Sequence, residues 1–113
     1  MKKIEAVVRT SRLDDVVNRL YLIGIRGLTV EEVHGMSAST SKPAGFWRGV
    51  RLQQVTEPRY QLILVVRDED ADGVVRAIVQ TARTTAAGDG LVTVSDVDGI
   101  MRIRTGEVDA DAI

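Results

Sequence analysis

Residues 60–82 read YQLILVVRDEDADGVVRAIVQTA, which places a strand signal directly before a helix signal. The apolar run of residues 60–66 is nearly continuous, as is typical of a well-covered central strand. The acidic residues at 68–70 then favour the start of a helix through its dipole. Apolar residues recur at helical spacing after them. The sequence therefore predicts a central strand and a helix with one buried stripe, formed by Ala71, Val74, Val75, Ile78, Val79 and Ala82.

The residues before this stretch show the same succession of strand and helix. Residues 3–9 are rich in β-branched side chains and predict a strand, and the hydroxyls of Thr10 and Ser11 are suited to cap a helix over residues 12–23. Gly24 stands where that helix would end. Its apolar stripe is predicted to consist of Leu13, Val16, Val17, Leu20 and Tyr21. Residues 28–34 predict a second, less regular strand.

The residues after the long helix contain a turn, Gly88-Asp89-Gly90, and two short strand signals at 91–94 and 100–104. The order of elements is then β-α-β-β-α-β. This order predicts an α+β, ferredoxin-like fold in which two helices cover one face of an antiparallel sheet, within a single domain over residues 1–113. The other face of the sheet would remain uncovered, which indicates association between subunits.

Composition and charge exclude several classes of protein. Hydrophobic residues make up 44% of the chain, charged residues 27%, and the net charge is -1, so neither disorder nor a nucleic-acid partner is indicated. The chain has no cysteine, which excludes disulfides and thiolate chemistry. We recognise no signal segment and no long apolar run, so we expect no membrane insertion and a cytoplasmic location.

Two features of the C-terminal half predict a phosphate site. The backbone amides of Gly88, Asp89 and Gly90 suit an anion-binding concavity of the kind formed by tight turns. Arg102 and Arg104, two positions apart in the predicted strand 100–104, would project from one face and offer bidentate contacts to phosphate. The alternative is an ordinary turn beside a solvated basic edge.

The segment from 36 to 56 has no periodicity, and a long segment of this kind in a small domain is either functional or disordered. Phe46 and Trp47 stand side by side in it and are candidates for contact with a protein partner, although they could also pack on the domain itself.

Basic residues in and beside the same segment are candidates for an anion site. Arg48, Arg51 and Arg59 would gather a small anion at the base of the loop, or they form a solvated set of charges. His34 is the only histidine and has no ligand partners at metal-binding spacing, so we expect a surface residue and no metal site.

Several motifs resemble the PII signal-transduction family in order and spacing, over nearly the whole length. They are Met1-Lys2-Lys3-Ile4-Glu5-Ala6, Leu13-Asp14-Asp15-Val16, Gly24-Ile25-Arg26-Gly27-Leu28-Thr29-Val30, Gly88-Asp89-Gly90 and Arg102-Ile103-Arg104-Thr105-Gly106-Glu107. The resemblance implies a homotrimer that binds adenine nucleotide (ADP, AMP or ATP) as effector in clefts between subunits. It also implies a T-loop, about residues 36–56, that acts on a protein target. It adds Thr29, Gly35 and Val65 to the nucleotide contacts, with Thr29 and Val65 near the base.

The glycine turn departs from the family pattern. The family turn Thr-Gly-x-x-Gly-Asp-Gly-Lys, often with a further lysine after its first glycine, corresponds here to residues 84–91, TTAAGDGL, which contain no lysine. Each missing cation near an outer phosphate removes roughly 1–3 kcal/mol of charge-assisted bonding. We therefore expect ADP or AMP to be favoured over ATP.

The T-loop departs as well. In the family, a glutamine early in the loop coordinates magnesium together with 2-oxoglutarate, and a tyrosine further along is uridylylated in some members. Residues 36–40 contain no glutamine, and Leu52 stands at the tyrosine position once one inserted residue is allowed. We expect neither enhancement by 2-oxoglutarate nor tyrosine modification, although Arg59 replaces the lysine that pairs with the 2-oxoglutarate carboxylate.

These departures favour a divergent PII-like regulator of inorganic-carbon metabolism or transport, such as the carboxysome-associated kind, with bicarbonate as an additional effector. The alternative is a nitrogen-regulatory PII protein that controls an ammonium transporter or a nitrogen enzyme. A small ferredoxin-like enzyme is the alternative of another class. Because no catalytic constellation is present in the sequence, we expect no catalytic residues and no enzyme activity. A nucleic-acid-binding sheet would need aromatic residues on its strands, which these strands lack.

Overall fold

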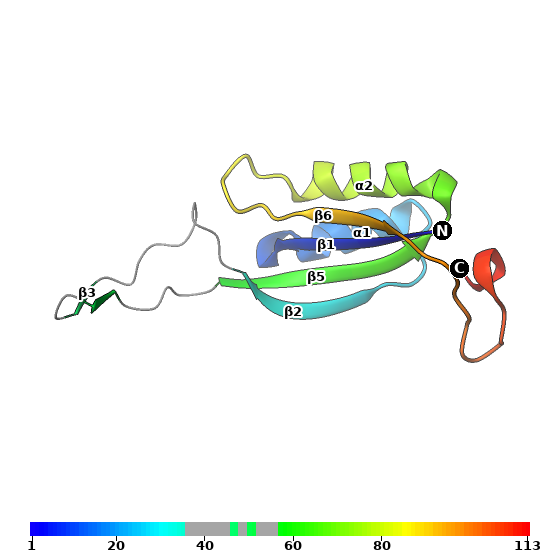
Figure 1. Ribbon diagram of the computed structural model, residues 1–113. Coiled ribbons are helices and arrows are strands. Elements are labelled where there is room, and N and C mark those ends of the chain that lie inside the picture. Colours follow the sequence, from blue (N-terminus) through cyan, green and yellow to red (C-terminus); the bar gives the residue numbers. More distant parts are fainter. Residues whose placement is uncertain (36–45, 48–49, 52–56) are drawn as a thin grey trace.

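The computed structural model describes residues 1–35, 46–47, 50–51 and 57–113 (Figure 1). Within the predicted T-loop, residues 36–45, 48–49 and 52–56, and with them Arg48, lie outside the described residues. The elements in chain order are β1 (Lys2–Arg9), η1 (Thr10–Arg12), α1 (Leu13–Leu22), β2 (Thr29–Gly35), β3 (Phe46–Trp47), β4 (Val50–Arg51), β5 (Glu57–Val66), α2 (Asp68–Ala82), β6 (Val92–Asp96) and η2 (Asp109–Ala112).

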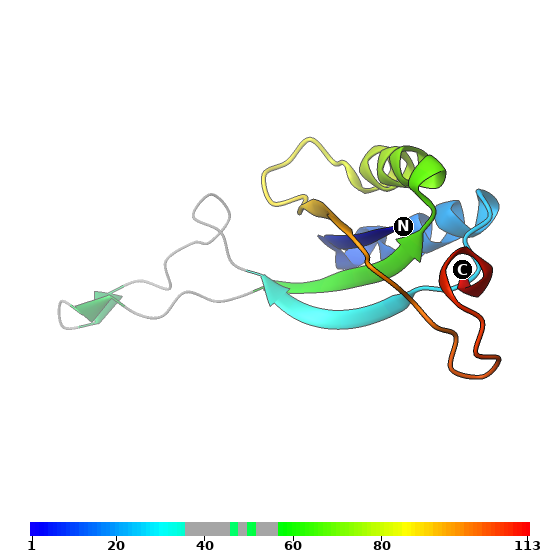
Figure 2. The ribbon, with the colours of Figure 1, turned by 45° about the vertical axis from the view of Figure 1, so that its right-hand side comes forward.

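A four-stranded antiparallel sheet in the order β2-β5-β1-β6 forms the body of the protein. Both α-helices lie on the same face of this sheet (Figures 1 and 2). The predicted ferredoxin-like α+β fold is therefore confirmed, and β6 is its last strand. No helix among the described residues has the length and apolar character needed to cross a membrane.

The core lies between the sheet and the two helices. Alternate residues of β1 and β5 are buried, since successive side chains of a strand point to opposite faces. The helices contribute stripes at three- and four-residue spacing. The buried cluster contains Ile4, Ala6, Val8, Leu62, Leu64 and Val66 from the strands, and Val16, Leu20, Ala71, Val74, Ile78 and Ala82 from the helices.

Three details of the predicted helices differ in the structure. Tyr21 is 63% exposed and not in the core, because α1 ends at Leu22 and the guanidinium of Arg26 stacks 4.9 Å from the tyrosine ring. In α2, Ala77 is buried while Val75 and Val79 are only half-buried. The hydroxyls of Thr10 and Ser11 do not cap α1. These residues belong instead to the short helix η1, and the residue before α1, Arg12, makes no side-chain cap.

The predicted strand at 100–104 is wrong. Met101 forms only an isolated bridge with Val108, and the backbone between them closes into a turn. The N–H of Arg102 donates to the carbonyl of Glu107 at 2.8 Å, and that of Gly106 donates to the carbonyl of Arg102 at 2.8 Å. Gly106 has φ +72, a conformation that ends any extended run. Arg102 and Arg104 therefore do not share the face of a strand.

The face of the sheet opposite the helices carries polar as well as apolar side chains. Glu5 bonds to Lys3 at 3.0 Å and accepts a hydrogen bond from the side-chain amide of Gln61 at 2.9 Å. Val7 and Ile63 lie on the same face and remain half-buried in a single chain. The prediction of an incompletely covered second face holds for these strands, but the face is mixed in character.

The predicted loop contains one short pairing, in which Phe46 lies opposite Arg51 and Trp47 lies opposite Val50. These strands, β3 and β4, form a separate two-stranded sheet. The roles predicted for Phe46 and Trp47 in partner binding, and for Arg51 in anion binding, remain predictions.

Candidate functional site

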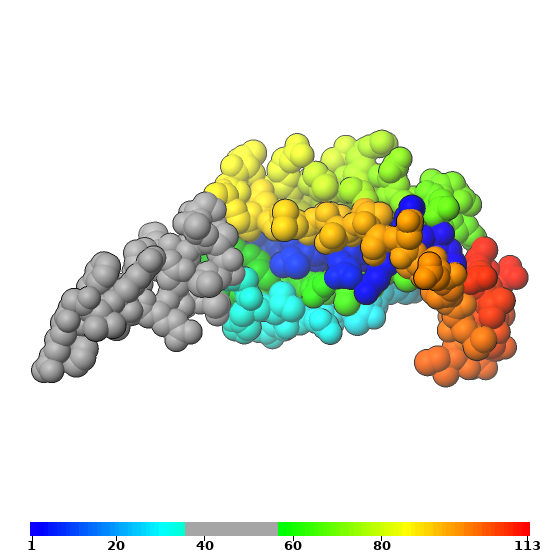
Figure 3. Space-filling view, viewed as in Figure 1, coloured from blue at the N-terminus to red at the C-terminus, as the bar shows by residue number. Residues whose placement is uncertain are grey.

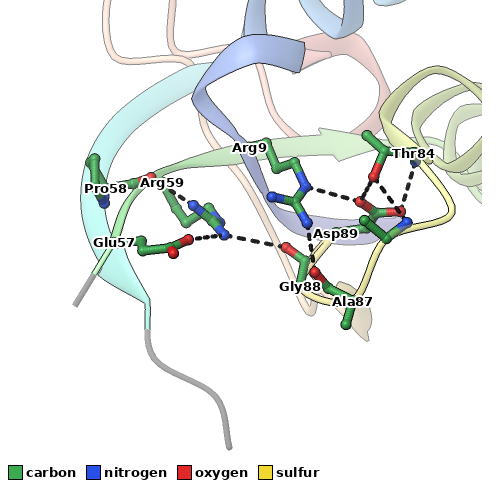
Figure 4. A network of polar contacts seen from close by, with 9 residues as sticks. Arg9, Glu57, Pro58, Arg59, Thr84, Ala87, Gly88 and Asp89 are labelled. Atoms are coloured by element: carbon green, nitrogen blue, oxygen red, sulfur yellow. Dashed lines mark hydrogen bonds and ion pairs between the residues drawn. The ribbon is translucent and has the colours of Figure 1, made fainter. Parts of the chain in front are cut away.

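The glycine turn, residues 88–90, lies beside the end of β1 and the first part of β5 (Figure 4). The carboxylate of Asp89 accepts hydrogen bonds from the N–H of Thr84 at 2.7 Å, from the hydroxyl of Thr84 and from Nε of Arg9 at 3.0 Å. Arg9 also donates to the carbonyl of Ala87 at 2.6 Å. The turn is thus tied by side chains both to the segment after α2 and to β1.

The backbone of the glycine turn presents its donors outward. Gly88 and Gly90 have φ values of +90 and +104, which bring successive amides close together. Within the described part of the chain, the N–H groups of Gly88, Asp89 and Gly90 donate no hydrogen bond. This arrangement leaves the three amides available to an anion, while the side chain of Asp89 stabilises the turn itself. Anion binding at the turn remains a prediction.

Gly90 also allows β1 and the turn to approach closely. The N–H of Val7 donates to the carbonyl of Leu91 at 3.0 Å, next to the pair Ala6–Val92, so the chain runs alongside β1 just before β6 begins. A Cβ atom at Gly90 would lie 1.8 Å from the carbonyl oxygen of Val7. Only glycine fits this close to β1.

Arg59 connects the base of the loop with the glycine turn. Its guanidinium bonds to the carboxylate of Glu57 at 2.7 Å and reaches the carbonyl of Gly88 at 3.5 Å, and its side chain is only 12% exposed. On the neighbouring strand β2, a Cβ atom at Gly35 would lie 3.4 Å from Cγ of Arg59. The predicted residues Gly35 and Arg59 are therefore neighbours, and a nearby carboxylate balances the charge of Arg59.

A cleft of about 550 Å³ lies at the opposite end of β5. Its lining includes Val65 and the three arginines Arg26, Arg67 and Arg102. Arg67 and Arg102 also donate to backbone carbonyls of the C-terminal segment, those of Ala110 at 3.0 Å and Ala112 at 2.8 Å. The cleft is basic, and the C-terminal residues form part of its wall.

A single chain does not bring all the predicted nucleotide contacts together. The stretch of β5 from Arg59 to Val65 is roughly 20 Å long. Gly35, Gly88, Asp89 and Gly90 lie toward one end of it, whereas Val65 and Arg102 lie at the other. Thr29 is exposed on β2 opposite Ile63, and Arg104 is exposed in the turn after Arg102.

Sequence reasoning missed two side chains that hold the glycine turn, Arg9 and Thr84, and the carboxylate of Glu57 that pairs with Arg59. Arg9 and Asp89 are 80 positions apart, so only the pairing of the strands shows that they meet. His34 is exposed on β2. Among the described residues, no group of histidine, cysteine, aspartate or glutamate side chains is arranged to hold a metal ion.

The hydrogen bonds from the Thr84 side chain, from its backbone N–H and from Arg9 hold the pKa of the Asp89 carboxyl well below its usual range. The stability that this lowered pKa supplies is fully present above the unfolded value of about 3.9 and is lost as the pH falls toward the folded value. The carboxylate is therefore ionised at neutral pH and in mild acid.

We expect the difference in melting temperature between wild type and Asp89→Asn to be largest near neutral pH and to narrow steadily below about pH 4. The reason is that protonation then removes from the wild type the charge that the variant lacks at every pH. Thermal melts followed by circular dichroism measure it. Asp98→Asn, at an exposed aspartate without a side-chain hydrogen bond among the described residues, is the control. A difference that stays constant down to pH 3 would show that the Asp89 charge is unimportant.

Comparison with known proteins gives a consistent match over the chain. A family model described as "Nitrogen regulatory protein P-II" matches residues 1–107. Nitrogen regulatory protein P-II of Pasteurella multocida is 42% identical over 113 residues, which cover all of both chains. Nitrogen regulatory protein P-II 1 of Methanothermobacter thermautotrophicus is 42% identical over all of this chain and 97% of its own. Nitrogen regulatory protein P-II 1 of Escherichia coli K12 is 40% identical over the full length of both.

Proposed function

Because the chain belongs to the nitrogen regulatory protein P-II family, we propose that it binds adenine nucleotide between subunits of a homotrimer and controls a protein target through its T-loop. Members of this family are regulatory signal-transduction proteins, so the chain is a regulator and not an enzyme. The family resemblance read from the sequence is confirmed.

The comparisons favour a role for this protein in regulating nitrogen metabolism over a role in inorganic-carbon metabolism. The relatives that match this chain at about 40% identity over its full length are named for nitrogen regulation. The role in bicarbonate metabolism, which rested on missing loop and turn residues, has no comparable support. We therefore favour the nitrogen alternative, with an ammonium transporter or a nitrogen enzyme as the target.

The observation that carries the nucleotide proposal is the separation of two complementary half-sites on one chain. The glycine turn offers amides that have no acceptor among the described residues at one end of β5, and the cleft around Arg102 offers guanidinium groups at the other. Copies related by rotation about an axis can place the turn of one subunit against the cleft of the next, and three such contacts close a ring. Each subunit would then complete its neighbour's site.

The charges around the glycine turn support a preference for short nucleotides. Leu91 is 80% exposed at the end of the turn, where the family pattern has lysine. Arg9 and Arg59 lie nearby, but each is paired with a carboxylate, that of Asp89 or of Glu57. The turn therefore offers hydrogen bonds from amides and no unpaired cation among these groups. Such a site holds the inner phosphates better than a γ-phosphate.

We expect the wild-type protein to bind ADP and AMP at least as tightly as ATP, and Leu91→Lys to tighten ATP binding about tenfold with a smaller gain for AMP. The added ammonium group would reach only the outer phosphates. Isothermal titration calorimetry, with and without magnesium and 2-oxoglutarate, measures both effects. Leu91→Gln is the uncharged control. Absence of adenine-nucleotide binding by the wild type would remove the proposal, and equal gains for AMP and ATP would refute the role of the missing lysine.

A further inference from the structure

The glycine turn is held by a group of side chains that we call the turn clamp: Arg9, Thr84 and Asp89 (Figure 4). Asp89 is the middle residue of the turn, and its carboxylate bonds to donors from two different parts of the chain. One donor, Arg9, is the last residue of β1, and the other, Thr84, follows α2. The clamp therefore fixes the turn to both layers of the fold.

The orientation of the turn amides follows from the bond between Arg9 and the carbonyl of Ala87. A trans peptide unit is planar, so its carbonyl and its N–H point in opposite directions. The peptide bonds of the described residues are all trans. When Arg9 draws the oxygen of Ala87 toward itself at 2.6 Å, the N–H of Gly88, in the same peptide unit, is aimed away from Arg9. The arginine thus determines where this amide can meet an anion.

Arg59 makes a weaker contact of the same kind at the next peptide unit. Its guanidinium lies 3.5 Å from the carbonyl of Gly88, and the same planarity directs the N–H of Asp89 away from Arg59. Two neighbouring carbonyls thus face arginines that come from β1 and β5. The amides of the same peptide units face the opposite side, where no protein group accepts their hydrogen bonds among the described residues.

We propose that Arg9 is a positioning residue, which with Asp89 and Thr84 orients the amides of the glycine turn toward phosphate, and that it does not contact the nucleotide itself. This inference rests on the proposed nucleotide function. Arg9 donates from Nε to the carboxylate of Asp89 and from a terminal nitrogen to the carbonyl of Ala87, and its side chain is only 23% exposed. The partner carboxylate neutralises its charge, so phosphate is recognised at the turn by oriented dipoles.

The variants Arg9→Met and Asp89→Asn test the clamp from its two sides. Arg9→Met keeps the apolar stem but removes the donors, and Asp89→Asn keeps the size but removes the charge. Arg83→Met is the matched control, because Arg83 is an exposed arginine near the turn whose side chain makes no hydrogen bond among the described residues. Melting temperatures establish that each variant is folded under the conditions of the assay.

Amide hydrogen exchange in the nucleotide-free protein is the first measurement. The amides of Thr84 and Ala86 are hydrogen-bonded within the turn, to the carboxylate of Asp89 and to the hydroxyl of Thr84. We expect these two amides to exchange about tenfold faster in Arg9→Met and Asp89→Asn than in wild type or Arg83→Met, while α2 and β1 stay protected. This measurement does not depend on nucleotide binding. Unchanged exchange at Thr84 and Ala86 in both variants would overturn the clamp, even if the wild type binds nucleotide as proposed.

Calorimetric titration with AMP, ADP and ATP is the second measurement. If Arg9 positions the turn, Arg9→Met and Asp89→Asn weaken all three nucleotides by a similar factor of about ten, and the double variant is little worse than either single variant. If Arg9 touches phosphate, its loss grows from AMP to ATP and adds to that of Asp89→Asn, and the inference is wrong. If the wild type itself binds no nucleotide, the proposed function is wrong, and the exchange measurement still tests whether the clamp holds the turn.

Discussion

Gly90→Ala is expected to destabilise the protein by about 3 kcal/mol or more, because no adjustment of a side chain can relieve the clash that it creates. The new Cβ atom would lie 1.8 Å from the carbonyl oxygen of Val7 and 2.9 Å from its carbonyl carbon. Both are backbone atoms of β1, the strand that pairs with β5 and β6. The φ value of +104 adds strain for any residue with a side chain.

Chemical denaturation measures this loss, and α2 offers a matched control. Gly73 lies inside that helix, and a Cβ atom there would meet no other atom within 4 Å. Gly73→Ala should therefore stabilise the protein by roughly 0.5–1 kcal/mol, since alanine favours the helix and glycine does not. If Gly90→Ala melted like the wild type, the close approach of Gly90 to the backbone of β1 would be disproved.

The second large effect is expected when two variants that each fail to bind nucleotide are combined in one trimer. Arg102→Gln removes a guanidinium from the cleft and keeps a donor for the carbonyl of Ala112. Leu91→Glu places a carboxylate next to the glycine turn, at a position whose side chain is exposed. Each variant alone should bind ADP about 100-fold more weakly than wild type, through a lost or repelling charge next to phosphate.

Mixed trimers regain sites in which the intact turn of one variant meets the intact cleft of the other. Random mixing in equal amounts should restore about a quarter of all sites. Each site combines the turn of one subunit with the cleft of the next, and both are intact only when the Arg102 variant supplies the turn and the Leu91 variant supplies the cleft. Calorimetry of co-expressed, co-purified variants gives the stoichiometry, and light scattering tests the proposed trimer. Self-assembled single variants are the controls. Failure of the mixture to bind better than its parts would show that the turn and the cleft of one site do not come from two different subunits.

The fold was predictable because its signals are local. The alternation in β1 and β5 and the helical spacing in α2 lie within short segments, and each element was found within a few residues of its place. The strand predicted at 100–104 was wrong because hydrogen bonds and a glycine conformation outside the pattern decide its structure. An alternating segment looks like a strand, but the hydrogen bonds between Arg102 and Glu107 and the conformation of Gly106 turn it back on itself. Nothing in the alternation signals such a reversal.

The candidate site was predictable only in its backbone part. Two glycines around an aspartate indicate a tight turn with exposed amides, and the structure has that turn. The partners of the turn come from Arg9 and Arg59, and their proximity depends on which residues of β1 and β5 lie opposite each other. Such pairing is a property of the whole sheet, so no short motif contains it.

The position of β1 in the sheet determines when the protein can fold during synthesis. Lys2 lies opposite Val66 on one side and Asp96 on the other. The two strands that pair with β1 are therefore synthesised well after it. Closing such distant contacts is slow compared with forming α1 or α2. A nascent chain that has not yet released β6 leaves the backbone N–H and C=O groups along one edge of β1 without their partner strand. Chaperones that bind extended segments would therefore find an open edge at β1, and this edge closes once β6 has paired with it.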